Sequence, residues 1–203
     1  MAFISNGTTI LDNGAFDVSL GGLVLLSEQT ASGSASISFT SGIDSTYDIY
    51  KFEFINIHPA SAQEFRFNLS TDGGSNYNVI KTTTAFVAFH YENDSSALLS
   101  YASSADLAQS TANQTIAGQI STANSKNASG SLYLFNPSST TFVKHFISNS
   151  NAGATDGGGD LRSLEYFVAG YGNTTSAINA IRFLMASGNI DDGIIKMYGI
   201  KGS

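Results

Sequence analysis

Histidine and cysteine, the residue types most often used in metal sites and nucleophilic catalysis, are scarce in this chain. The three histidines are His58, His90 and His145, and none has a second histidine nearby in the spacing that zinc ligands show. The chain contains no cysteine, which excludes disulfide bonds, a thiolate metal site and a cysteine nucleophile. We therefore predict neither a metal site nor a cofactor.

The acidic residues do not form a catalytic pattern either. The aspartates expected in loops are Asp72, Asp156, Asp160, Asp191 and Asp192. They do not match the D-x-[DN]-x-[DN]-G pattern of a calcium loop, and turn formation by Asp and Gly explains them. The glutamates at expected solvent-facing strand positions are Glu53, Glu64, Glu92 and Glu165. Hydrolysis of a glycan needs two carboxylates facing each other across a cleft, which this pattern does not predict.

Two further catalytic signatures are missing. The chain has no G-x-S-x-G nucleophile elbow, and Gly157-Gly158-Gly159 is not followed by the lysine of a phosphate-binding loop. We therefore predict that the protein is not an enzyme.

Chain length and net charge narrow the possible classes of protein further. A chain of 203 residues forms one large domain, or one domain plus an appendage. The net charge of −7 argues against nucleic-acid binding, because phosphate contacts require clustered Lys and Arg. The first residues lack the basic and apolar regions of a signal peptide, and no apolar run reaches the length of a membrane span. The sequence therefore predicts a soluble protein made in a cytoplasm.

The chain is organised around two alternating stretches between residues 47 and 77. The first places Tyr50, Phe52 and Phe54 on one face, and the second does the same with Phe65, Phe67 and Leu69. Residues 57–61, which contain Pro59, are expected to break the run. Because this short link joins the two stretches, they are expected to pair as a β-hairpin. A turn is predicted at residues 72–76, where the second stretch ends.

The same alternation predicts ten or so short strands along the body of the chain, from residue 23 to residue 203. Other expected strands are 23–26, buried on both sides, and 35–39, 79–84, 86–91, 132–135, 142–147, 164–171, 178–185 and 194–200. Residues 92–129 are expected to form long loops, with Ile116 and Ile120 as strand markers and a possible short helix at 101–108. Residues 149–160 are expected to form a Gly-rich loop. The predicted fold is an all-β antiparallel sandwich of the jelly-roll type.

Residues 1–22 differ from the body. Asn6-Gly7, Asn13-Gly14 and Gly21-Gly22 are turn signals spaced too closely for strands of normal length. We interpret this segment as an extended arm that packs on its own body or on a neighbouring subunit; the alternative is a first hairpin of the main sheet. Its candidate partner-binding residues are Phe3, Ile4, Ile10, Leu11 and Phe16.

Four stretches carry a resemblance to a known group of proteins. They are Ala2–Ile10, Tyr50–Pro59, Leu134–Thr141 and Gly193–Ile200. Together they resemble small virion structural proteins of marine tailed bacteriophages, of the head-decoration or tail-fibre type. The resemblance implies a trimeric jelly-roll component of the virion that acts by adhesion to other capsid or tail proteins.

Two other functions remain open. The loops at 92–130 and 149–160 could recognise a host-surface glycan, because loops on a rigid sandwich often carry a binding surface. The second alternative function is a glycan hydrolase.

Tyrosines at expected strand ends could pack between subunits, stack on sugar rings or simply cap the sandwich. They are Tyr50, Tyr77, Tyr91, Tyr133, Tyr166, Tyr171 and Tyr198.

Overall fold

The computed structural model describes all residues except 1–2, 6–7, 13–14, 17–21, 157–158 and 201–203. The described residues form strands and connections without a helix, which confirms the all-β prediction. The strands are β1 Phe3–Ser5, β2 Thr8–Asp12, β3 Ala15–Phe16, β4 Leu23–Ser34, β5 Ile37–Phe39, β6 Ile49–Pro59, β7 Gln63–Ser70, β8 Lys81–Tyr91, β9 Ala97–Tyr101, β10 Gln114–Ile120, β11 Ala128–Phe135, β12 Lys144–Thr155, β13 Leu161–Gly172, β14 Ala180–Met185 and β15 Ile190–Ile200. The described part of the chain contains no helix that is long and apolar enough to cross a membrane.

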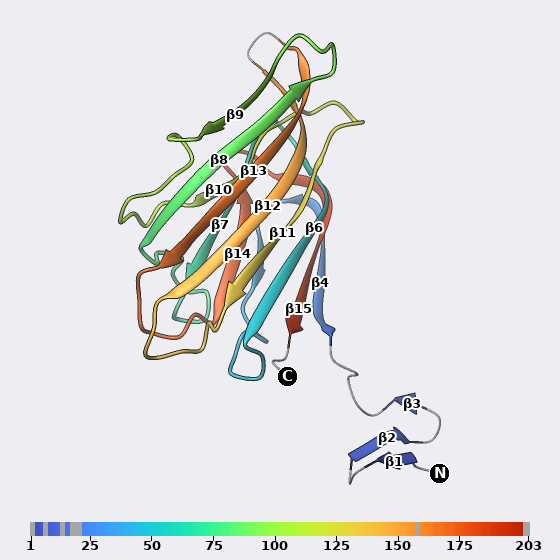
Figure 1. Cartoon of the computed structure of the whole chain (residues 1–203), viewed down its shortest axis with the longest axis vertical. Coiled ribbons are helices and arrows are strands. Elements are labelled where there is room, and N and C mark those ends of the chain that lie inside the picture. Colours follow the sequence, from blue (N-terminus) through green and yellow to red (C-terminus); the bar gives the residue numbers. More distant parts are fainter. Residues whose placement is uncertain (1–2, 6–7, 13–14, 17–21, 157–158, 201–203) are drawn as a thin grey trace.

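The body is an antiparallel sandwich with two layers of unequal size (Figure 1). The large sheet has the strand order β4–β15–β6–β11–β12–β13–β8–β9, and the small sheet has the order β10–β7–β14–β5. The layers join at one corner, where Ile120 of β10 pairs with Ala154 of β12. β4 is an edge strand of the large sheet and β5 is an edge strand of the small sheet. The short link between β4 and β5 joins these two edges, so the structure is nearly closed.

The core lies between the two sheets and centres on Phe183 of β14. The centroid of its ring lies 5.1 Å from that of Phe54 and 5.5 Å from that of Phe52, both on β6 of the opposite sheet. Phe65 of the neighbouring strand β7 stacks on Phe183 at 5.9 Å. None of these side chains is more than 2% exposed. The alternation in β6, β7 and β14 therefore builds one aromatic core, as the sequence predicts for Phe52, Phe54 and Phe65.

The predicted hairpin of β6 with β7 is wrong. β6 pairs with β11 and β15 in the large sheet, whereas β7 pairs with β10 and β14 in the small sheet. Residues 60–62 cross from one layer to the other, which brings the rings of Phe54 and Phe65 within 5.3 Å. The two alternating strands thus pack face to face instead of edge to edge.

The predicted break at residues 57–61 begins too early, because β6 continues to Pro59. Asn56 has φ 53°, and the pairing of β6 shifts register around it against both β11 and β15. This bulge changes the phase of the strand, so that Phe54 and Ile57 are both buried. Opposite the bulge, Gly193 has φ 127°, and a Cβ there would lie 2.9 Å from the backbone oxygen of Asn56. Only glycine fits at that position.

Residues 23–26 are not buried on both sides. In the described part of the chain β4 pairs with β15 alone, so it forms an edge of the large sheet. Leu23 is 46% exposed and Leu25 is 50% exposed. A continuous apolar run predicts burial, but it does not predict which strand lies at the edge.

The two strands expected at residues 79–84 and 86–91 belong mostly to one strand, β8. Two segments expected to be loops contain strands instead. Residues 92–129 contain β9, β10 and the start of β11, and no helix forms at 101–108. Ile116 and Ile120 are buried in β10, as their spacing predicts. Residues 149–155 form the second half of β12, where Ser150, Ala152 and Ala154 are buried and Asn149 and Asn151 are exposed.

The N-terminal segment is not an extended arm along its whole length. β1, β2 and β3 form a separate three-stranded antiparallel sheet, which we call the N-terminal sheet. In the described residues these strands pair with no strand of the body, so the alternative of a first hairpin in the main sheet is wrong. What the segment packs against stays a prediction.

Candidate functional site

One part of the outward side of the large sheet is apolar, and no layer of the described residues packs over it; the other part carries polar side chains such as Asn149, Asn151 and Glu165. Alternation in β8, β12 and β13 buries one set of side chains in the core and turns the other set outward. Strand register then places outward residues side by side: Phe86 lies opposite Phe167, and Ile147 lies between Tyr133 and Ala169. We call this surface the outer face. Its large side chains are Phe86, Leu99, Tyr101, Tyr133, Phe135, His145, Ile147, Phe167 and Tyr171.

The outer face is hollowed on both sides of Ile147. A groove of about 480 Å³ lies over β8, β12 and β13, with His145 and Tyr171 in its lining and Ala169 and Gly170 leaving space between them. A smaller groove of about 160 Å³ adjoins it and is bordered by the stacked rings of Phe86 and Phe167, which lie 4.9 Å apart. Ile147 lines both grooves and is 49% exposed. The face therefore offers a shaped apolar surface to a partner.

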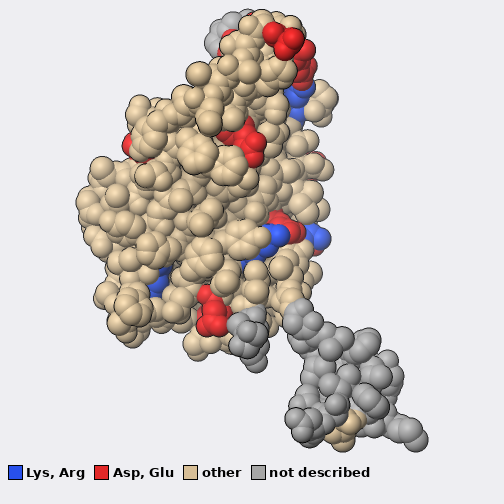
Figure 2. Space-filling view, in the orientation of Figure 1, with Lys and Arg blue, Asp and Glu red and all other residues tan. Residues whose placement is uncertain are grey.

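Few charged side chains interrupt this surface, as Figure 2 shows for the side that faces the viewer. Four charged side chains of the neighbouring strands β4, β6 and β15 form two ion pairs. Lys51 lies 2.6 Å from Glu53, and Lys196 lies 3.1 Å from Glu28. Each pairing partner raises the pKa of its lysine. These strands therefore form a polar border to the apolar grooves.

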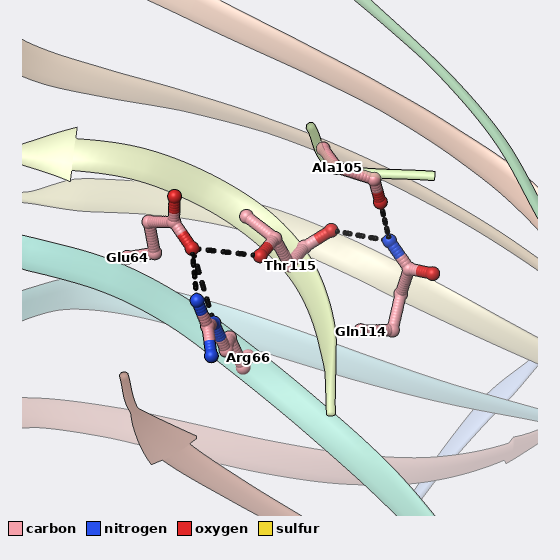
Figure 3. Close-up of polar contacts among 5 residues, drawn as sticks. All are labelled: Glu64, Arg66, Ala105, Gln114 and Thr115. Carbon is pink, nitrogen blue, oxygen red and sulfur yellow. Dashed lines mark hydrogen bonds and ion pairs between the residues drawn. The ribbon is translucent and has the colours of Figure 1, made fainter. Parts of the chain in front are cut away.

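The outward side of the small sheet is polar, in contrast to the outer face. Glu64 and Arg66 of β7 form an ion pair of 2.6 Å, and Glu64 also accepts a hydrogen bond of 2.9 Å from Thr115 of β10 (Figure 3). The amide of Gln114 donates to the backbone oxygens of Ala105 and Thr115. These bonds tie β7, β10 and the 102–113 connection together, so the charged groups are used within the fold.

Two lysines are buried in the body without an ion pair to any described residue. Lys81 donates hydrogen bonds of 2.6 Å to Asn68 Oδ1 and 2.8 Å to the backbone oxygen of Val79. Burial lowers the pKa of Lys81 to about 8. Lys144 donates to the backbone oxygens of Phe142 and Thr174, and burial lowers its pKa as well. Asn68 is only 1% exposed, and its Oδ1 accepts the hydrogen bond from the buried Lys81 ammonium group.

The histidines stand apart from one another. His58 lies 3.7 Å from Asp191, His90 lies 3.0 Å from Asp94, and His145 packs on Tyr171 with ring centroids 5.8 Å apart. Among the described residues no three His, Cys, Asp or Glu side chains are grouped so that they could hold a metal ion.

The candidate acids of the sequence analysis are also scattered. Asp72 accepts hydrogen bonds from Ser70 and Asn76, which lower its pKa to about 2 and fix the predicted turn. The Asp156 carboxylate accepts a hydrogen bond from the backbone N–H of Asp160, and the backbone N–H of Asp156 donates to the backbone oxygen of Asp160. Glu92 pairs with Lys126, and Glu165 lies half-buried on β13. Asp191 and Asp192 border a polar hollow together with His58.

The five partner-binding residues predicted in the N-terminal segment all lie in the N-terminal sheet. Phe3 pairs with Leu11, and Leu11 with Phe16, along the backbone. Ile4 is 59% exposed. The side chains of Phe3, Ile10, Leu11 and Phe16 lie outside the described residues, so their role stays a prediction.

Sequence reasoning missed most of the outer face. It named Tyr133 and Tyr171 as residues that could pack between subunits, but not Phe86, Ile147 or Phe167. A signal was present: Phe86-Val87-Ala88-Phe89 is apolar at every position, although only one side of β8 faces the core. Apolar residues on both sides of a strand indicate a second buried surface.

The fold and this face define an antiparallel β-sandwich with an uncovered apolar sheet. Comparison with known proteins adds no narrower class, since no family model, no curated protein and no solved structure matches the chain.

Proposed function

We propose that this protein is a structural subunit of a larger assembly and that it acts by adhesion through the outer face. The supporting observation is the apolar surface around Ile147, which no layer of the described structure covers. Monomers rarely leave a large apolar patch exposed, and such patches commonly mark protein interfaces. Adhesion of this kind requires no bond to be made or broken.

The size of the outer face suits a stable interface. β12 and β13 have 12 residues each, and at about 3.3 Å per residue they are about 40 Å long. With β8 and β11 beside them at a spacing of about 4.8 Å, the outward side of these strands covers about 750 Å², which includes the apolar outer face and its polar surroundings. Standard protein interfaces bury about 800 Å² on each partner.

The proposed assembly is a homotrimer that belongs to a tailed-phage virion, as a head-decoration protein or a tail-associated fibre protein. The trimer and the virion rest on the resemblance in sequence described above. In a closed trimer the outer face of each subunit would pack against a different surface of its neighbour, so that all three outer faces would be covered. The N-terminal sheet would then be free to contact other capsid or tail proteins.

Light scattering after size-exclusion chromatography tests the interface directly. We expect the full chain to form a trimer and the Ile147→Glu variant to be a monomer, because the new carboxylate would be buried between subunits without a partner. Phe142→Glu is the matched control: Phe142 is 70% exposed in the connection before β12, outside both grooves, and the variant should remain a trimer. A monomeric wild type, or a trimeric Ile147→Glu variant, would contradict the proposal.

A second experiment tests the virion. Locating the density of this chain in a reconstruction of the particle would distinguish head from tail. If the chain is absent from purified particles, the assignment to a virion is wrong, and the proposal of adhesion through the outer face is unaffected.

A further inference from the structure

A polar hollow of about 350 Å³ lies at one end of the sandwich, away from the grooves of the outer face. It is lined by Asn56 and His58 of β6, by Asp191 and Asp192 of β15, and by Asn124, Lys126 and Asn127 of the connection between β10 and β11. Three segments that are distant in sequence thus contribute polar side chains to one space. Ligand sites in proteins commonly measure about 300–1,000 Å³.

The backbone around the hollow is held in place by hydrogen bonds. The bulge at Asn56 is fixed by its N–H, which donates to Ser129 Oγ at 3.1 Å. The connection is fixed by the N–H of Gly153, which donates to the backbone oxygen of Asn127 at 2.9 Å. Bulges re-aim side chains and are frequent beside binding sites, and here the bulges of β6 and β15 lie next to each other. The lining is therefore built by the fold before any ligand arrives.

Several of the polar groups in this lining have no partner among the described residues. The side-chain amides of Asn56, Asn124 and Asn127 make no hydrogen bond to any described residue. His58 Nε2 is buried and likewise lacks a hydrogen-bond partner in the described structure. A buried polar atom without a partner is rare in a native protein and calls for a ligand or a water molecule. The hollow therefore presents several donors and acceptors that are free to bind.

Charge limits what the ligand can be. Asp191 and Asp192 contribute two carboxylates, whereas the Lys126 ammonium group is already paired with Glu92 at 2.5 Å. An anionic ligand would be repelled by this arrangement and by the net charge of −7. A ligand rich in hydroxyl groups fits better, because carboxylates accept hydrogen bonds from hydroxyls and asparagine amides both donate and accept.

We propose that this hollow binds a neutral saccharide unit through its hydroxyl groups. Asp191 accepts hydrogen bonds from the sugar, as does Asp192 through Oδ2, because its Oδ1 is occupied by the N–H of Gly193 at 2.7 Å. Asn56, Asn124 and Asn127 bond to further hydroxyls. This binding function is separate from adhesion through the outer face.

The site also refines the glycan hypothesis of the sequence analysis. Residues 92–130 supply Asn124, Lys126 and Asn127, as that hypothesis expects of this segment. Residues 149–160 supply none of the lining residues, and most of that segment is β12. The contributions of β6 and β15 depend on the three-dimensional fold and were not foreseen.

Nuclear magnetic resonance titration of the isotopically labelled full chain tests the proposal. The probes are methyl glycosides of glucose, galactose, mannose and N-acetylglucosamine, with methyl sialoside as an anionic comparison, all in the presence of EDTA. We expect at least one neutral glycoside to shift the amide signals of residues 56–58, 124–127 and 190–193. Asp191→Asn should weaken that binding about tenfold or more, since it removes a charged acceptor.

Asp94→Asn is the matched control, because Asp94 carries the same carboxylate at an exposed turn beside His90. Its binding should equal that of the wild type. The proposal is overturned if no neutral glycoside binds, if the sialoside binds best, if binding requires calcium in place of EDTA, or if the shifts cluster around His145 and Tyr171.

Discussion

Among single residues, Lys81 is the most unusual feature of the core. Its side chain is fully buried, and its ammonium group contacts only neutral oxygens in the described part of the chain. Burial without a carboxylate favours the neutral amine, which is why its pKa falls to about 8 from 10.5. A group of this kind makes the stability of the fold depend on pH.

The sign of this dependence follows from proton binding. Between pH 8 and 10.5 the unfolded chain holds the Lys81 proton and the folded chain releases it, so the free energy of unfolding rises with pH. We expect a gain of about 2 kcal/mol between about pH 7.5 and 9.5, measured by urea unfolding. Lys81→Met should lose this gain, whereas Lys51→Met, at a half-exposed ion pair, should keep it. If the free energy of unfolding rises equally with pH in the wild type and in Lys81→Met, the pH dependence does not come from Lys81. Buried Tyr50 and Tyr166 have a raised pKa and act in the opposite direction, but only at higher pH.

Phe183 supports a second prediction for a single residue. It contacts rings from both sheets, including Phe39, Phe52 and Phe67, and it is fully buried. Phe183→Ala should lower the free energy of unfolding by about 3–5 kcal/mol, because it removes buried area and leaves a cavity between the sheets. Phe142→Ala, at a residue that is 70% exposed, should change it by about 0.5 kcal/mol or less. Chemical denaturation of both variants measures the difference, and equal losses would place the core elsewhere.

The positions of the strands were easier to predict than the pairing between strands. Alternation identifies β6 and β7 correctly because Phe52, Phe54, Phe65 and Phe67 all bury one face. It says nothing about whether two such strands share hydrogen bonds or face each other, and here the short crossover at 60–62 puts them in opposite sheets. Pairing depends on contacts between residues far apart in sequence, which a local pattern does not contain.

Other errors in the expected secondary structure arise where a strand consists of small polar residues. Residues 149–155 look like a loop because they are small and polar, yet β13 pairs with all of them on one side. On the other side β11 pairs with them as far as Ala152, and Ile120 of β10 pairs with Ala154. Ser150 is buried there because its hydroxyl donates to the backbone oxygen of Ile116. The saccharide hollow escaped prediction for the same reason, since His58, Asn124 and Asp191 meet only after the sheet has formed.

The N-terminal sheet provides a prediction for one element. In the described residues its strands pair only with each other, and the body has its own core beginning at β4. Removing residues 1–20 should therefore leave the melting temperature of the body unchanged while abolishing incorporation into particles. Calorimetry and copurification with particles measure the two effects. Normal incorporation of the truncated chain would show that the segment does not dock.

Viewed as a whole, the molecule has two opposite faces with different chemistry. The small sheet carries the Glu64–Arg66 pair and the Arg182 side chain stacked on Tyr77, whereas the outer face of the large sheet carries Phe86, Ile147 and Phe167. Only 12% of the residues are charged, so ion pairs between subunits have few candidates. Adhesion through the outer face would therefore depend on apolar burial.

This difference predicts the response of the assembly to salt. Raising NaCl from about 0.1 M to about 1 M shortens the Debye length from about 10 Å to about 3 Å, which weakens contacts between exposed charges and leaves apolar burial intact. The dissociation constant of the trimer, measured by sedimentation equilibrium, should stay constant or fall over this range. The melting temperature of monomeric Ile147→Glu in the same series controls for effects of salt on the fold itself. A trimer that weakens about tenfold or more with added salt would place the interface on charged surfaces instead of the outer face.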